Sequence, residues 1–278
     1  MKPRHLLTAD IAKAIGVHPN TVRMYEVWGF LPPIPRGRNG YRLYTAAHLD
    51  QMRLARTALH GQWPGRNIRR SALELVRRSA SGDLTGALEQ ARQHLVLVQA
   101  ERAQAEEAAQ LLERWARGIT ASKNITPLQI KETAELLGVS TDVLRNWERN
   151  GLIKAPRDQR NQYRLYGAAE IDRLRVLRML FHAGYSTMAV LRMIRHLDTG
   201  QRRNLRQLLD TPRPDEEVLS AADRWLTTLT AQEQRAQGLI DQLKQMIRKQ
   251  RKKAQHISSS STPIVLLRAL APLGLAPN

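Results

Sequence analysis

The sequence has no cysteine, few aromatic residues and no long apolar run. Without thiols, the protein can form neither disulfide bonds nor thiolate metal sites, and it cannot hold an iron–sulfur cluster on cysteines. Without about 18 consecutive apolar residues it has no membrane-spanning helix, and its first residues lack the apolar core of a signal peptide. These absences exclude several sensing chemistries and lead us to expect a cytoplasmic protein that does not contact the membrane.

Patterns typical of catalysis or metal binding are also missing. The eight histidines include no H-E-x-x-H pair, and His60 and His182 are expected to be packing or surface residues. The sequence contains no glycine-rich phosphate loop and no credible pair of nucleophile and base. We therefore expect no enzymatic activity, no metal ion and no cofactor.

Positive charge is what the chain has in excess. It carries 44 Lys and Arg against 25 Asp and Glu, a formal net charge of +19. Residues 1–82 hold 14 basic and 4 acidic groups, and residues 118–215 hold 17 and 10. Such surfaces suit a polyanion such as nucleic acid, although a solvated basic surface is the alternative.

The same two regions repeat each other in sequence. Residues 16–31 return 122 residues later as residues 138–153, and Tyr41-Arg42-Leu43-Tyr44 returns as Tyr163-Arg164-Leu165-Tyr166. A period of this length indicates two whole domains rather than a solenoid.

Each repeat begins with a helix-turn-helix pattern. In the first, Thr8 can cap a short helix that Gly16 ends, and Pro19 suits the first position of the next helix. Prolines after residue 31 stop helical structure, and Asn39-Gly40 predicts a tight hairpin that forms a wing. Helices over about 46–59 and 67–79 would complete the domain.

A long helix follows each repeat. Apolar residues between Leu84 and Ala116 alternate in spacings of four and three, and a second such seam runs from Leu219 to Ile247. Each seam contains one charge, Arg102 in the first and Glu233 in the second. An antiparallel alignment that pairs these charges also pairs apolar residues with each other: Leu88 with Ile247, Leu95 with Ile240, Ala109 with Leu226, and Ala116 with Leu219. The alternative is that each charge reaches water and the agreement is accidental.

The predicted fold is therefore mainly α. Two winged helix-turn-helix domains are each followed by a long helix, and the long helices pair as an antiparallel coiled coil. The expected boundaries are 1–82 for the first domain, 83–117 for its helix, 118–125 for a linker, 126–214 for the second domain, 215–256 for its helix and 257–278 for an apolar tail. We expect a monomer with an internal pseudo-two-fold axis, with a swapped homodimer as the alternative.

The pattern T-x-R-x-Y-E at residues 21–26, followed by a glycine, a proline-rich turn and N-G-Y-R-x-Y at residues 39–44, resembles the DNA-binding domain of the mercury-resistance regulator (MerR) family. The resemblance implies a transcriptional regulator that binds double-stranded DNA and distorts promoters with an over-long spacer for RNA polymerase. The cysteines of the metal-sensing members and the ligand domain of the drug-sensing members are missing from this sequence.

The second helix of each motif would place its first turns against base edges in the major groove. Arg23 and Arg145 can fork onto guanine or clamp a phosphate, or they can pair with Glu26 and Glu148. Tyr25 and Trp147 contact the DNA backbone or anchor the helix, and wing arginines suit phosphates or the minor groove. The candidate DNA-binding residues are His18, Asn20, Thr21, Arg23, Tyr25, Arg36, Arg38 and Arg42 in the first repeat, and Ser140, Asp142, Val143, Arg145, Trp147, Arg157, Arg160 and Arg164 in the second.

The repeats differ where base recognition is expected. Asp142 stands where the first repeat has Asn20, so only one recognition surface carries an acid. We therefore expect an operator with two non-identical half-sites, of which the second is bound more weakly.

Three further features have two interpretations each. The basic run at residues 248–253 adds phosphate contacts or simply suits a helix end. Trp115 and Trp225 line a ligand pocket or fill the core. The apolar tail at residues 263–275 packs on the coil or first domain, or docks a partner. Two other functions stay open: an architectural or excisionase-like DNA-binding protein of a mobile element, and a protein that sequesters a small molecule.

Overall fold

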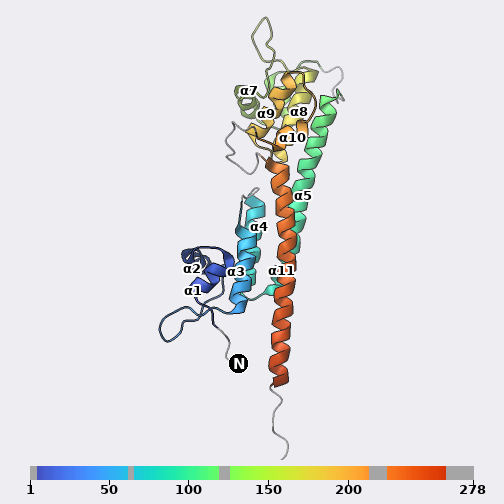
Figure 1. Ribbon diagram of the computed structural model, residues 1–278. Helices are drawn as coiled ribbons and strands as arrows, with labels where there is room; N and C mark the ends of the chain where they lie inside the picture. Colours follow the sequence, from blue (N-terminus) through green and yellow to red (C-terminus); the bar gives the residue numbers. More distant parts are fainter. Residues whose placement is uncertain (1–4, 62–65, 119–125, 213–223, 261–278) are drawn as a thin grey trace, which may run out of the picture.

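A computed structural model of the chain describes residues 5–61, 66–118, 126–212 and 224–260 (Figure 1). All regular structure in these ranges is helical, and β-structure there is limited to isolated bridges. None of the helices in these ranges is long and apolar enough to cross a membrane. The prediction of a mainly α fold is confirmed.

The first head consists of four helices, α1 (Thr8–Ile15), α2 (Pro19–Val27), α3 (Ala46–Leu59) and α4 (Arg66–Ala80). α3 begins where Thr45 Oγ1 accepts a hydrogen bond from the His48 backbone N–H at 3.4 Å, which satisfies one free donor of the first turn. The core of this head buries Ile11, Val22, Met52 and Leu75 completely. These four side chains come one from each helix, so the helices share one core.

The second head repeats this order with α6 (Ile130–Leu137), α7 (Thr141–Arg149), α8 (Ala168–His182) and α9 (Thr187–Asp198), and adds the short α10 (Leu205–Asp210). In sequence, α10 corresponds to the start of the long helix of the first repeat. The predicted helix over 215–256 begins, in the part that the structure describes, only at Trp225. The seam residues Leu219 and Ala222, the linker residues 119–125 and the tail 261–278 lie outside the described residues.

The long helices α5 (Leu84–Ala116) and α11 (Trp225–Ser260) run antiparallel along each other (Figure 1). On α5, Ala91, Val98 and Leu112 are fully buried, and so are Leu229 and Leu243 on α11. Close contact between two long helices favours small residues such as Ala91, because they let the backbones approach.

Arg102 and Glu233 meet in this pairing, as in the register derived from the sequence. Arg102 Nη1 lies 2.9 Å from Glu233 Oε2, and Gln99 Nε2 donates to Glu233 Oε1 at 2.9 Å. The pair is not a buried one, because 48% of the Arg102 side chain and 25% of the Glu233 side chain are exposed.

The deeply buried polar side chains of the long helices are instead His94 and Gln232. The heads also pack against the long helices, which widens the covered face of each helix beyond a two-helix seam.

Each long helix packs on the head of the other repeat. α11 contacts α3 of the first head, and α5 contacts α8 of the second. Because α3 and α8 are equivalent in sequence, the two contacts correspond to each other. We call them joint 1 (α3 with α11) and joint 2 (α8 with α5).

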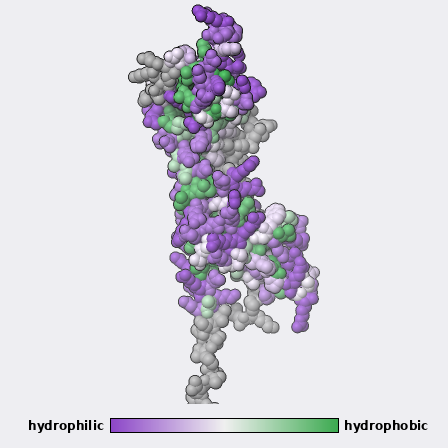
Figure 2. Space-filling view, turned by 180° about the vertical axis from the view of Figure 1, so that it is seen from behind, coloured by the Kyte–Doolittle hydropathy of each residue, from purple (hydrophilic) through white to green (hydrophobic). Residues whose placement is uncertain are grey.

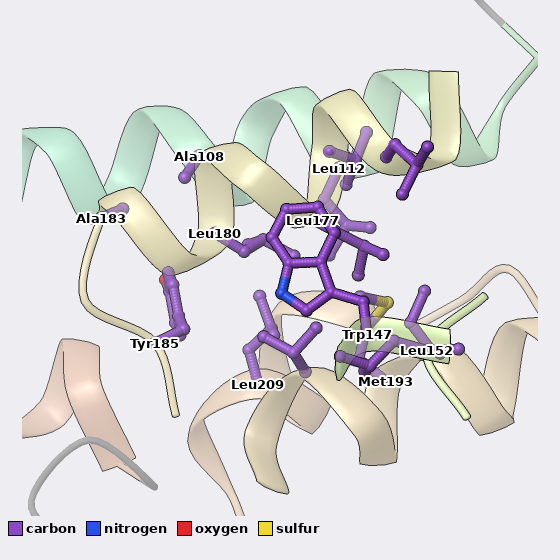
Figure 3. Close-up of a cluster of buried hydrophobic side chains, with 14 of the residues drawn as sticks. Ala108, Leu112, Trp147, Leu152, Leu177, Leu180, Ala183, Tyr185, Met193 and Leu209 are labelled. Atoms are coloured by element: carbon purple, nitrogen blue, oxygen red, sulfur yellow. The ribbon is translucent and has the colours of Figure 1, made fainter. Parts of the chain in front are cut away.

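Joint 2 has an apolar centre. Ala108 and Leu112 of α5 face Leu177 and Leu180 of α8 (Figure 3). The Tyr185 hydroxyl donates to the Ala105 carbonyl oxygen at 3.1 Å, and burial raises its pKa. These contacts fix the second head on α5.

The start of α11 also closes on the second head. Trp225 Nε1 donates to the Ala183 carbonyl oxygen at 2.6 Å. Gly184 has a φ of +94°, and a Cβ added there would lie 2.6 Å from the Trp225 ring. This turn therefore requires glycine, because a side chain would both strain the backbone and displace the indole.

Joint 1 adds polar contacts to apolar packing, because Leu243 and Met246 of α11 belong to the buried cluster of the first head. Gln242 Nε2 donates to Thr57 Oγ1 at 2.9 Å, and Lys249 Nζ lies 2.8 Å from Asp50 Oδ2. Arg235 Nη1 donates to the His60 carbonyl oxygen at 2.7 Å. Both joints thus have an apolar core, and joint 1 carries an additional hydrogen bond and ion pair between side chains.

Reversing the charge of Glu233 tests the helix register. Glu233→Lys should lower the free energy of unfolding by about 1 kcal/mol, because it replaces a half-exposed ion pair with repulsion. Adding Arg102→Glu should restore most of this loss, as measured by urea denaturation of the single and double variants. Additive losses in the double variant would contradict the register.

The buried His94 should make stability depend on pH. Burial lowers its pKa to about 4, whereas the unfolded side chain titrates near 6.5. Between these two pH values the unfolded state binds more protons, so the free energy of unfolding should fall by about 3 kcal/mol as the pH drops from 6.5 to 4.

His94→Leu should remove this part of the pH dependence in thermal or urea denaturation. His182→Gln, at an exposed histidine of α8, is the matched control and should keep it. An unchanged slope in His94→Leu would show that other groups carry the effect.

Candidate nucleic-acid interface

Each head presents a helix-turn-helix unit with a capped second helix. In the first head, Gly16 ends α1 at φ +72°, a left-handed conformation that glycine adopts without strain. The His18 Nδ1 atom accepts a hydrogen bond from the Asn20 backbone N–H at 3.2 Å, and Pro19 follows as the first residue of α2. In the second head, Ser140 Oγ accepts from the Val143 backbone N–H at 3.3 Å. His18 and Ser140 therefore both cap the recognition helices α2 and α7.

The recognition arginines are exposed and held by neighbours on their own helices. Arg23 Nη1 donates to Asn20 Oδ1 at 2.9 Å, and Arg145 Nη1 lies at the same distance from Asp142 Oδ1. The exchange of Asn20 for Asp142 between the repeats thus changes the partner of the recognition arginine. A neutral amide holds Arg23, whereas a carboxylate with an 84% exposed side chain holds Arg145.

The glutamates of the recognition helices bind the wings. Arg42 Nε lies 2.6 Å from Glu26 Oε2, and Arg164 Nε lies 2.5 Å from Glu148 Oε2. Both arginines are only partly exposed, because the returning arm of each wing passes beside the last turn of the helix. Arg23 and Arg145 are not the partners of these glutamates. The same ion pair in both heads fixes the wing relative to the helix.

Each wing is a short hairpin held by one bridge. Arg36 bridges to Arg42 in the first wing, and Arg157 bridges to Arg164 in the second, so the second wing contains one more residue. The second repeat has one residue fewer between Ile153 and Arg157, and this deletion compensates for the extra residue in the wing. The offset of 122 residues is therefore the same before and after the wing. Gln162 therefore adopts a φ of +62°, where the first wing has Gly40.

The wing arginines differ in their contacts. Arg36 Nη1 donates to the Gly40 carbonyl oxygen at 3.3 Å, and Arg157 Nη1 donates to that of Gln162 at 3.1 Å. These bonds fold the arginines back onto their own turns. Arg38 and Arg160 are exposed at the tips.

The aromatic residues of the motif are core residues. Tyr25 is 5% exposed and packs edge-on against Phe30, with ring centroids 5.6 Å apart. Trp147 is 7% exposed and stacks on Phe181 within the cluster of Figure 3. Burial favours the interpretation that they anchor the helices over the interpretation that they contact a DNA backbone. The partly buried Val143 also packs against this core.

The two helix-turn-helix units lie on the same side of the paired long helices (Figure 1). In Figure 1, α2 and α7 both lie to the left of the paired long helices. The remaining candidates, Asn20, Thr21, Arg23, Arg38, Asp142, Arg145 and Arg160, come from these two helices and their wings. The view from behind (Figure 2) is mainly hydrophilic, with apolar residues in small separate patches.

The two tryptophans for which a pocket was one of two interpretations do not share one in the described part of the chain. Trp115 lines an open cleft with Glu148 and Arg173, whereas Trp225 is buried and bonded to Ala183. In the same ranges, no group of three acidic or histidine side chains could hold a metal ion.

Two helix-turn-helix units with wings, joined through paired long helices, define a tandem winged helix-turn-helix protein. A family model described as MerR HTH family regulatory protein matches residues 8–73 and 128–197, one match in each repeat. The chain belongs to this family, and the prediction of two tandem copies of its domain is confirmed.

Curated relatives match parts of the chain. A probable heavy metal-dependent transcriptional regulator of Haemophilus influenzae is 30% identical over 122 residues, which are 44% of this chain and 81% of the relative. The HTH-type transcriptional regulator CueR of Escherichia coli O157:H7 is 42% identical over 50 residues, which are 18% of this chain but only 37% of the relative. CueR of Salmonella typhimurium is 42% identical over the same length. No solved structure is found to match the chain.

The two kinds of wing arginine should differ in their effect on stability. Arg42→Ala should lower the free energy of unfolding by about 1–2 kcal/mol, because it leaves the half-buried Glu26 carboxylate without its partner. Arg38→Ala, at the exposed wing tip, should change it by less than about 0.5 kcal/mol. Urea denaturation of both variants checks this, and equal losses would contradict the structural role of Arg42.

Proposed function

We propose that the protein is a sequence-specific regulator of transcription that binds double-stranded DNA, with both DNA-reading heads supplied by one chain. The observation that carries the proposal is the repeated geometry of α2 and α7. Each helix begins with a capped turn and carries an exposed arginine, Arg23 or Arg145, and the two helices lie on the same side of the paired long helices (Figure 1).

Each head would read one half-site. The first turns of α2 and α7 would enter the major groove, where a guanidinium can bind guanine through two hydrogen bonds. The exposed Arg38 and Arg160 at the wing tips would contact phosphates beside the groove. Arg42 and Arg164 would act indirectly, because their ion pairs with Glu26 and Glu148 hold the wings at a fixed distance from the recognition helices.

The paired long helices would set the spacing between the heads. α5 has 33 residues and is roughly 50 Å long, which is comparable to more than one turn of DNA. Bending a site of 20–30 base pairs costs about 1–6 kcal/mol, so a rigid connection helps to hold a bent duplex. We propose that the protein acts in the cytoplasm as a monomer, distorts its promoter, and thereby brings RNA polymerase to it.

Specificity would differ between the two heads. Asp142 places a negative charge on α7 that repels phosphates and withholds Arg145 from a base. The first head, in which the neutral Asn20 holds Arg23, would therefore bind its half-site more tightly. The operator would consist of two non-identical halves.

Selection of bound genomic fragments, followed by footprinting and a run-off transcription assay, tests this function. We expect discrete promoter sites, an affinity that falls steeply with salt, and a change in transcript level when protein is added. Arg23→Ala should cost about 1–3 kcal/mol at the first half-site only. Arg145→Ala should cost less at the second half-site, because Asp142 already withholds that guanidinium. Sites confined to the ends of mobile elements would support an excisionase-like role instead, and the absence of salt-sensitive binding would refute DNA binding.

Exchanging the acid between the heads tests their difference. Asp142→Asn should tighten binding to an operator about three- to tenfold, because it removes a repulsive charge from α7. Asn20→Asp, the matched change in the first head, should weaken binding by a similar or larger factor. Fluorescence anisotropy with either half-site scrambled assigns each effect to its half. A selected operator that is a perfect palindrome would contradict the proposed asymmetry.

A further inference from the structure

A cleft of about 340 Å³ lies at joint 1, between the first head and α11. α3 contributes Asp50, Arg53 and Arg56 to its lining, and α11 contributes Gln242 and Lys249. Its volume is within the range of sites that hold small molecules. The cleft is separate from the exposed residues of α2 and from the wing.

Positive charge dominates the lining. Lys249 Nζ contacts both carboxylate oxygens of Asp50, at 3.0 and 2.8 Å, and Arg53 Nη1 lies 3.6 Å from Asp50 Oδ1. The Asp50 carboxylate thus pairs with both Lys249 and Arg53. The Arg56 side chain has no ion pair within the described ranges. The net charge of these four groups is two positive, which a ligand with two negative charges would neutralise.

The cleft also contains a buried acceptor that lacks a donor. Gln242 Nε2 donates to Thr57 Oγ1, but Gln242 Oε1 is buried and has no hydrogen-bond partner among the residues that the structure describes. A buried polar atom without a partner costs roughly 1–3 kcal/mol. A ligand hydroxyl can supply the missing donor when the Gln242 amide turns toward the cleft, because Oε1 itself is closed to solvent.

Joint 2 provides an internal comparison. Asp172, Arg175 and Arg178 of α8 repeat the Asp50, Arg53 and Arg56 of α3. The helix that faces them is α5, whose Ala108 and Leu112 pack tightly on apolar residues of α8 (Figure 3). The arginines are therefore common to both heads, and the polar lining from α11 distinguishes joint 1.

We propose that the cleft at joint 1 binds a small dianion that carries a hydroxyl group, such as a polyol phosphate or a hydroxy-dicarboxylate. Arg53 and Arg56 bind its anionic groups, and Gln242 Oε1 accepts a hydrogen bond from its hydroxyl. Because the ligand contacts both α3 and α11, it ties the first head to the long helix of the second repeat.

Methyl NMR of the full chain labelled at methionine tests this inference. Met246 lines the cleft, and the fully buried Met193 of the second head is the internal reference. The probes are glycerol 3-phosphate and malate, with succinate lacking the hydroxyl and lactate lacking the second charge. We expect one or both of the first two to shift the Met246 signal at millimolar concentration and to leave Met193 unchanged, and the stronger of the two identifies the anionic group.

Paired arginine variants complete the test. Arg56→Ala should weaken binding of that probe at least tenfold, whereas the matched Arg178→Ala should leave it unchanged. If Arg56→Ala does not fold, Arg56→Gln keeps the side-chain stem and removes the charge. No Met246 shift with either probe up to about 10 mM, or equal losses in the two variants, would overturn the site.

The hydroxyl has its own test, since equal binding of succinate and malate would overturn the role of Gln242. All of these measurements are made without DNA, so their failure would leave the proposed function untouched.

Discussion

The antiparallel pairing of α5 with α11 is the contact on which the rest of the molecule depends. Neither head is fixed by its own long helix alone, because α11 packs on the first head and α5 packs on the second. If the pair separated, each head would lose one of the surfaces that hold it. The ion pair of Arg102 with Glu233 lies at the edge of this contact and contributes to register more than to stability.

The two joints show how one duplicated design has diverged. At joint 2, Tyr185 donates a hydrogen bond to the Ala105 carbonyl oxygen, and beside it Trp225 of α11 donates to that of Ala183. At joint 1, Lys249 and Gln242 reach across to Asp50 and Thr57 and leave a cleft. Separating packed apolar surfaces costs much free energy, whereas polar groups at a surface can exchange one partner for another or for water. Both joints have apolar packing, so the polar side chains around the cleft are the part of joint 1 that a solute would contact.

Much of this fold could be read from the sequence, because local rules and long-range pattern agreed. Gly16 and Gly138 end their helices in both repeats, and the charges at residues 102 and 233 meet as their register predicts. The burial of Tyr25 and Trp147 could not be read, because an aromatic residue on a short helix suits the core and a DNA backbone equally well. The sequence also did not reveal that Glu26 and Glu148 bind the wings or that His94 is buried. The wing contacts and the burial of His94 depend on which elements pack together. The predicted pair of long helices did not include the contacts that the heads make with them.

The pairing of α5 with α11 also has a consequence for the order of synthesis. The contact between Arg102 and Glu233 joins residues 131 positions apart, so α5 leaves the ribosome long before α11 exists. At 5–20 residues per second this interval is on the order of 10 s, which is far longer than helices need to form. During that time the apolar face of α5 is without its partner in the same chain, and α11 of a completed neighbour on the same messenger RNA can compete for it. The speed of translation, rather than the final contact surface, then determines how often α5 of one chain pairs with α11 of another.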